Sequence, residues 1–203
     1  MIDRPGKIVC VGRNYVAHAK ELGNEMPLEP LIFLKPPSSV IPTGAPIVLP
    51  PQSQQVEYEG EIGVVIGHAL KHASESAARE GIKAVVAVND VTARDLQKSD
   101  GQWTRAKGFD TFCPLGGVAP SRDLATLEIV TRVNGTERQR AKAAEMAFAI
   151  PRLLAYISTV MTLEPGDLVA TGTPAGVGPL APGDTVEIEI TGLSVVRNPV
   201  VRA

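Results

Sequence analysis

The sequence has little cysteine, few aromatic residues and no marked excess of charge of either sign. Its two cysteines, Cys10 and Cys113, are too few to form a disulfide framework or a zinc cluster by themselves. Neither cysteine has a histidine nearby in the sequence that could activate its thiol. We therefore interpret both as small core residues and not as nucleophiles.

The charge balance and the absence of long apolar runs exclude several classes of partner. The 20 Lys and Arg residues nearly balance the 22 Asp and Glu residues, so nothing electrostatic favours nucleic acid or an anionic membrane. No apolar run is long enough to cross a bilayer, and residues 1–5 lack the apolar stretch of a signal peptide. We expect a reduced, cytoplasmic protein with no nucleic-acid or membrane partner.

The remaining composition is typical of a globular domain. A hydrophobic fraction of 44% and a charged fraction of 21% over 203 residues are sufficient for a sizeable core. The 19 glycines and 17 prolines indicate many turns between short elements. No internal repeat or linker-like composition interrupts the chain, which predicts a single domain over residues 1–203.

Short apolar or alternating segments predict mostly strands. They lie at residues 7–12, 31–35, 47–49, 56–67, 84–88, 127–133, 168–171, 186–190 and 193–201. Asn134-Gly135 predicts a hairpin turn after residues 127–133. Helices are predicted at residues 16–22, from Ser74 or Ser76 to about Gly81, and from Pro151 toward Met161. This order indicates a β-rich α+β fold and not a doubly wound sheet.

Three glutamates alternate along the predicted strand at residues 56–67. Because side chains at i and i+2 share one face of a strand, Glu57, Glu59 and Glu61 project together. Their carboxylates repel one another unless a cation neutralises them, and a hard divalent cation such as Mg²⁺ prefers oxygen ligands of this kind. The alternative is the solvated outer face of an edge strand, which is the commoner meaning of alternating glutamates.

Asp90 follows the small-apolar strand at residues 84–88. A carboxylate at the end of a buried strand lies at the rim of the sheet, where sites tend to form. Asn89 or Asp90 could equally cap the turn that leads to Thr92. The pattern alone leaves the ligand and the cap interpretations open.

His18 and Glu21 are three residues apart in the predicted helix at residues 16–22, so they are neighbours on one helical face. A carboxylate beside an imidazole raises its basicity and fixes its orientation, as a general base toward water requires. The alternative is a solvated ion pair beside Lys20.

The glycine-rich segment at residues 171–178 lacks the lysine of a nucleoside-triphosphate loop and is not followed by a helix pattern. Its backbone amides and the hydroxyls of Thr171 and Thr173 suit the binding of a carboxylate. A plain turn between strands is the alternative.

Taken together and in this order, these segments resemble the fumarylacetoacetate hydrolase superfamily. The resemblance runs from about Lys7 to the final strand. The short length of the chain is similar to that of the acylpyruvase and oxaloacetate decarboxylase branch. The segments that carry it are residues 12–15, His18, Glu21 and residues 58–61, 89–95, 103–112, 163–167 and 171–178.

The resemblance implies a fold, an assembly and a metal. The implied fold is a mixed β-sandwich roll with a few short helices, usually a homodimer. Mg²⁺ or Mn²⁺ is expected on the carboxylates of Glu59, Glu61 and Asp90, which leaves Glu57 outside the ligand set. Residues 13–26, including His18 and Glu21, are expected to form a lid over the substrate.

The resemblance also implies roles for residues around the metal. Lys107 is expected in the pocket as a catalytic residue together with His18 and Glu21, and substrate contacts are expected at Arg13, Tyr15, Gln97 and Thr173.

The leading hypothesis is a metal-dependent hydrolase that cleaves acylpyruvates into pyruvate and a carboxylic acid. His18, oriented by Glu21, would deprotonate the attacking water, and Lys107 would stabilise the developing negative charge. The alternative is a decarboxylase or isomerase of 2-oxo dicarboxylic acids, such as oxaloacetate or intermediates of aromatic breakdown. A non-catalytic, metal-stabilised β module is a third reading, which the histidine–glutamate pair disfavours.

Overall fold

The computed structural model describes residues 4–21, 23, 25–120 and 123–203. Its largest element is a seven-stranded mixed sheet. In spatial order its strands are β2 (Leu31–Lys35), β1 (Ile8–Gly12), β12 (Leu168–Ala170), β6 (Gly60–Ile66), β7 (Ile82–Asn89), β9 (Cys113–Leu115) and β3 (Val40–Pro42).

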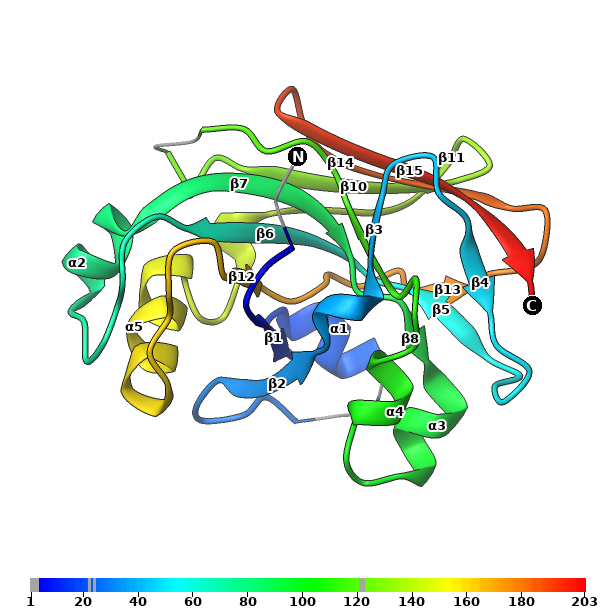
Figure 1. The fold of residues 1–203 in the computed structure, drawn as a ribbon, viewed down its shortest axis with the longest axis horizontal. Helices are drawn as coiled ribbons and strands as arrows, with labels where there is room; N and C mark the ends of the chain where they lie inside the picture. The colour runs from blue at the N-terminus through cyan, green and yellow to red at the C-terminus, as the bar shows by residue number, and fades with distance from the viewer. Residues whose placement is uncertain (1–3, 22, 24, 121–122) are drawn as a thin grey trace.

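A second, five-stranded sheet packs over β6 and β7 (Figure 1). In spatial order its strands are β11 (Thr136–Lys142), β10 (Glu128–Val133), β14 (Thr185–Ile190), β15 (Ser194–Arg202) and β4 (Ile47–Leu49). A small sheet of three strands joins β13 (Gly178–Pro179), β5 (Val56–Tyr58) and β8 (Thr92–Ala93). The β-rich α+β fold predicted from the sequence is confirmed.

Short helices lie at the ends of the sheets. Figure 1 shows α2 and α5 at one end of the molecule and α3 and α4 at the other. The α-helices are α1 (Val16–Glu21), α2 (Glu75–Glu80), α3 (Arg94–Ser99), α4 (Thr104–Lys107) and α5 (Ile150–Val160), and the 3₁₀ turns are η1 (Pro37–Ser39) and η2 (Ala143–Glu145). Within the described residues, none of the helices is long and apolar enough to cross a membrane.

Strand β7 is buried on both of its faces, as its unbroken apolar sequence predicts. Val85 and Ala87 belong to the large core that includes the five-stranded sheet. Val86 and Val88 belong to a second apolar cluster on the opposite face, which also contains Cys10 and Cys113. Both cysteines are fully buried and unpaired, in agreement with their interpretation as core residues.

Local signals in the sequence located two boundaries correctly. Asn134 and Gly135 have φ of 53° and 78° and connect β10 to β11, where Val133 pairs with Thr136. Left-handed backbone at both positions is what a tight two-residue hairpin requires. Of the two candidate caps for α2, Ser74 is the correct one, because its hydroxyl accepts a hydrogen bond from Ala77 N at 3.2 Å.

The single strand predicted at residues 56–67 is wrong, because the chain divides at Glu59 into β5 and β6, which belong to different sheets. The backbone N–H of Glu59 donates to the Asn89 side chain at 3.0 Å, so it is unavailable to a strand partner. At the next residue, Gly60, an added Cβ would lie 2.0 Å from Thr131 Oγ1. The divided strand places Glu59 at a corner between the two sheets.

Gly63 of β6 provides a test of the packing beneath this corner. A Cβ there would lie 2.5 Å from Val88 Cγ2 and 2.8 Å from Val86 Cγ1. We expect Gly63→Ala to lower the free energy of unfolding by about 1–3 kcal/mol, because overpacking strains a close-packed core. Urea titration of the variant against Gly117→Ala, whose Cβ would meet nothing within 4 Å, provides the comparison. Equal stability of the two variants would contradict the packing described for β6.

Candidate active site

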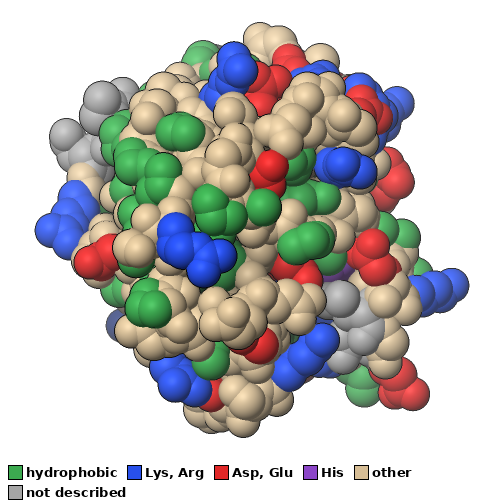
Figure 2. Space-filling view, turned by 90° about the vertical axis from the view of Figure 1, so that its right-hand side faces the viewer, with side chains coloured by type: hydrophobic (Ala, Val, Ile, Leu, Met, Phe, Trp, Pro, Cys, Tyr) green, Lys and Arg blue, Asp and Glu red, His purple; other side chains and the backbone are tan. Residues whose placement is uncertain are grey.

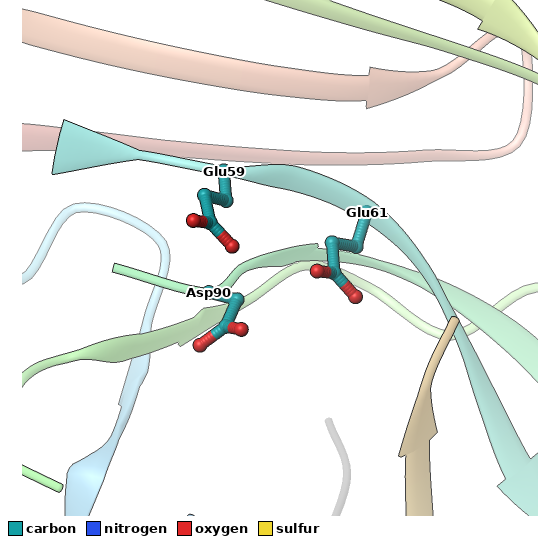
Figure 3. A group of neighbouring side chains, drawn as sticks. All are labelled: Glu59, Glu61 and Asp90. Atoms are coloured by element: carbon teal, nitrogen blue, oxygen red, sulfur yellow. The ribbon is translucent and has the colours of Figure 1, made fainter. Parts of the chain in front are cut away.

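Three buried carboxylates from separate segments meet at the corner where β5 and β6 divide. Glu59 lies between the two strands, Glu61 lies on β6, and Asp90 follows β7. The antiparallel register pairs Gly60 with Asn89 and Glu61 with Val88, so Asp90 is brought alongside both glutamates. One oxygen of each carboxylate lies within 4.8 Å of the others, and Figure 3 shows the three side chains converging on one space.

Cationic side chains surround two of the three carboxylates. Lys107 Nζ donates to Glu59 Oε2 at 2.9 Å and to Asp90 Oδ2 at 2.6 Å. Lys35 Nζ donates to Asp90 Oδ1 at 2.6 Å, and Arg94 Nη2 donates to Glu59 Oε1 at 2.5 Å. All of these side chains are buried, so the ion pairs are poorly screened by solvent.

Glu61 is held differently. Among the described residues, its carboxylate accepts a hydrogen bond from a backbone amide, Gly172 N, at 2.7 Å. Burial, and then the neighbouring charges of Asp90 and Glu59, raise the pKa of Glu61 well above its ordinary value. For Glu59, burial would also raise the pKa, but Lys107 and Arg94 outweigh it and hold the pKa well below the ordinary value. The raised pKa favours the protonated form of Glu61, because the protein places no cation against this carboxyl group that outweighs its burial. A divalent cation at the cluster would supply that charge and favour the carboxylate form.

Glu57 does not belong to this cluster. Its carboxylate accepts from Arg94 Nε at 2.7 Å and from Gln55 Nε2 at 2.6 Å. The strand periodicity grouped Glu57 with Glu59 and Glu61, but Glu57 is not part of the candidate metal-binding cluster. The alternative of a solvated outer face is also wrong, because all three glutamates are buried.

The interpretation of Asn89 or Asp90 as a helix cap is wrong as well. Ala93 is the N-cap residue of α3, without a side-chain hydrogen bond. The Asn89 side chain accepts a hydrogen bond from Glu59 N, and each carboxylate oxygen of Asp90 accepts one from a lysine. Asp90 therefore belongs to the acidic cluster.

His18 and Glu21 form a pair on α1 that faces the same space. His18 Nδ1 lies 3.3 Å from Glu21 Oε2, and the imidazole is buried. The carboxylate of Glu21 also accepts from Gly176 N at 3.0 Å, which ties α1 to the glycine-rich segment. The alternative, a solvated His18–Glu21 ion pair beside Lys20, is wrong for His18 because its imidazole is buried. The lid role of residues 13–26 remains a prediction, and residues 22 and 24 lie outside the described residues.

The glycine-rich segment at residues 171–178 is part of the site and more than a plain turn. Gly172 N donates to Glu61, and Thr173 Oγ1 donates to Gly60 O at 2.9 Å. Gly172 has a φ of +99°, and a Cβ there would lie 2.7 Å from Asn14 Cβ, so glycine is required for this approach. The segment holds Glu61 and Glu21 in place through backbone amides.

A cavity of about 480 Å³ contains most of the predicted residues. Its lining includes Arg13, His18, Glu21, Glu59, Glu61, Asp90, Gln97, Lys107 and Thr173. Tyr15 is the exception. The residue is 3% exposed and belongs to the large core, and its backbone forms an isolated antiparallel β-bridge with Met146. The substrate contact expected at Tyr15 therefore remains a prediction, although Tyr15 is not among the residues that line this cavity.

Sequence reasoning missed Lys35 and left Arg94 without a role. Lys35 ends the apolar strand β2 and is followed by two prolines, and a lysine in that position carries no signal of burial. Arg94, four residues after Asp90, bridges Glu57 and Glu59 and lines the cavity. Glu57 and Glu59, two acids at i and i+2, were the available signal that a positively charged side chain lies nearby.

Comparison with known proteins agrees with this arrangement. The family described as fumarylacetoacetate (FAA) hydrolase C-terminal matches residues 7–201. The chain is 46% identical over 204 residues to a mitochondrial oxaloacetate tautomerase of Arabidopsis thaliana, covering 97% of this chain and 92% of the relative. It is 45% identical over 195 residues to a mitochondrial oxaloacetate decarboxylase of Dictyostelium discoideum, covering 92% and 89%.

Among solved structures, fumarylpyruvate hydrolase from Pseudomonas aeruginosa in complex with Mn²⁺ and pyruvate superposes with a TM-score of 0.91. The two chains share 32% identity, and the match covers 97% of this chain and 90% of the other. Extensive sequence identity, the common fold and the acidic cluster lead to one conclusion. The chain is an enzyme of the fumarylacetoacetate hydrolase family.

Proposed function

We propose that the protein is a Mg²⁺- or Mn²⁺-dependent enzyme of 2-oxo dicarboxylic acids, which decarboxylates or tautomerises substrates of the oxaloacetate type. The observation that carries the proposal is the cluster of Glu59, Glu61 and Asp90, which faces a cavity that also contains the ammonium group of Lys107. The two curated relatives named for oxaloacetate chemistry favour this reaction over acylpyruvate hydrolysis.

The residues present fit a divalent cation. Glu59, Glu61 and Asp90 would hold it through carboxylate oxygens, the donors that Mg²⁺ and Mn²⁺ prefer. The Mn²⁺ and pyruvate in the related hydrolase structure support the same assignment for this chain. When bound, the cation would supply a Lewis acid for the oxygens of a 2-oxo acid and stabilise an enolate.

Lys107 is suited to stabilise negative charge and not to act as a base. Burial alone would lower its pKa, but the carboxylates of Asp90 and Glu59 outweigh burial and raise the pKa above the ordinary value. The side chain therefore remains an ammonium group at neutral pH. Fixed positive charge inside a buried site stabilises an enolate oxygen without reorganisation of solvent.

Two further cations in the cavity lining suit a second carboxylate. Arg13 and Lys98 line the cavity, and neither has an ion-pair partner within the described ranges. A dicarboxylic 2-oxo acid could therefore be oriented with one end at the acidic cluster and the other near these side chains. In decarboxylation, the bond to the departing carboxylate breaks, CO₂ leaves, and the electron pair is retained in the enolate.

Hydrolysis of acylpyruvates is the second candidate function, and the His18–Glu21 pair favours it. His18 would take a proton from a water that attacks the distal carbonyl carbon. Cleavage of the adjacent carbon–carbon bond then yields pyruvate, as its enolate, and a carboxylic acid. Glu21, held by Gly176 N, would fix the orientation of the imidazole.

The purified protein should be incubated with oxaloacetate, acetylpyruvate and fumarylpyruvate, each with Mg²⁺, with Mn²⁺ and with excess EDTA. We expect metal-dependent loss of oxaloacetate to be the fastest reaction and chelation to abolish it. Faster loss of an acylpyruvate would establish the second candidate instead. Turnover that persists after complete chelation would contradict the metal requirement in both.

We also propose a homodimer, which the family resemblance implies. Light scattering during size-exclusion chromatography is expected to give twice the mass of one chain. The mass of a single chain across the concentration range of the assay would contradict this assembly.

A further inference from the structure

Two hollows lie on either side of one aromatic wall. The cavity that contains the acidic cluster and a neighbouring groove of about 820 Å³ are both lined by Phe33 and Trp103. The groove is otherwise largely apolar, with Ile32, Leu34 and Pro36 in its lining. Leu34 is 48% exposed, so the groove opens to solvent along the edge strand β2.

The cations that line the groove are already paired. The side chain of Lys7 pairs with Asp167, that of Lys35 with Asp90 and that of Arg105 with Asp100. The groove thus offers apolar contact and no uncommitted positive charge in the part of the chain that the structure describes. A hydrocarbon chain would gain apolar contact in the groove, whereas a second carboxylate would meet no unpaired cation among the described residues.

The wall is held in place from both sides. The rings of Phe33 and Trp103 meet edge to face, with centroids 5.2 Å apart and an angle of 75°. Lys107 Nζ lies 5.0 Å from the centre of the Phe33 ring, so that ring is next to the acidic cluster. Gly12 leaves room for the indole, since a Cβ there would lie 2.9 Å from Trp103 Cζ3.

We propose that Trp103 limits the length of the substrate by separating the active-site cavity from the apolar groove. This inference rests on the proposed function, because it assumes that a 2-oxo acid binds at the acidic cluster. With the indole present, the cavity accepts a short or dicarboxylic 2-oxo acid. Without it, the cavity continues into the groove and accepts a 2-oxo acid with an extended alkyl chain.

The test compares binding of pyruvate, 2-oxohexanoate and 2-oxooctanoate to the Mg²⁺-loaded protein by calorimetry. We expect the affinity of the wild type to fall with chain length. In Trp103→Ala the ratio of 2-oxooctanoate to pyruvate affinity should rise by roughly tenfold or more, because each buried methylene favours binding. Trp103→Phe, which retains an aromatic ring, should show a smaller rise.

A second substitution tests whether the chain enters the groove. Leu34→Asp, combined with Trp103→Ala, places a charge in the groove at a residue that does not line the active-site cavity, and it should remove the gain. If Trp103→Ala does not fold, Trp103→Leu carries the same test with an apolar side chain. A gain that survives Leu34→Asp would contradict the proposed route.

The outcomes separate this inference from the function on which it rests. If pyruvate binds to the wild type but the ratio of 2-oxooctanoate to pyruvate affinity is unchanged in the Trp103 variants, the proposed role of Trp103 is overturned. The proposed function then stands. If the Mg²⁺-loaded wild type neither binds pyruvate nor turns over oxaloacetate, the proposed function is overturned, and the inference with it.

Discussion

Asp90→Asn is expected to abolish metal binding and turnover together. The substitution keeps the shape of the side chain but removes one of three carboxylates whose oxygens lie within 4.8 Å of one another. It also leaves Lys35 and Lys107 with a neutral partner in a buried site, which raises the local positive charge against a cation. Loss of a hydrogen-bonded neighbour of a ligand typically lowers metal affinity by about 10–100-fold, and loss of a ligand should exceed that.

Titration calorimetry with Mn²⁺ and an oxaloacetate assay measure the two effects on the same samples. Asp100→Asn is a suitable control, because Asp100 pairs with Arg105 at the surface and does not line the cavity. Thermal melting of both variants separates loss of the site from loss of the fold. Turnover by folded Asp90→Asn at the wild-type rate would show that Asp90 is not required in the metal site.

His18→Ala is expected to separate the two candidate reactions. Removal of a general base typically lowers the rate by about 10²–10⁴-fold, so hydrolysis of acetylpyruvate should fall by that amount. Decarboxylation of oxaloacetate needs no attack by water and should fall much less. The ratio of the two values of kcat/KM, measured for wild type and variant, is the informative quantity.

His68→Ala provides the matched control, because His68 is exposed in the loop after β6 and does not line the cavity. It is expected to leave both reactions near the wild-type rate. Equal losses of hydrolysis and decarboxylation in His18→Ala would count against activation of water and assign His18 a role common to both reactions.

Features that depend on neighbours along the chain were predictable from the sequence. The hairpin at Asn134-Gly135 follows from backbone preference, and Ser74 follows from the capping of α2. The alternation of Glu59 and Glu61 likewise placed two metal-ligand candidates on one side of the chain. These signals are local, so no knowledge of tertiary structure is needed to use them.

Features that depend on strand register could not be derived locally. Asp90 reaches the glutamates because β6 pairs with β7 so that Gly60 lies opposite Asn89, and the sequence pattern alone left a helix cap equally open. Lys35 reaches Asp90 across 55 residues of sequence. The family resemblance supplied the ligand set. It also assigned Tyr15 to the substrate, which remains a prediction for a side chain that the structure places in the core.

The central claim is that Glu59, Glu61 and Asp90 together bind one divalent cation. Crystals soaked in Mn²⁺ and measured near the manganese absorption edge test it directly. An anomalous-difference peak bounded by these three carboxylates is the predicted result. A map in which the cluster carries no peak, or in which Lys107 retains its bonds to Glu59 and Asp90 while Mn²⁺ binds elsewhere, would contradict the claim.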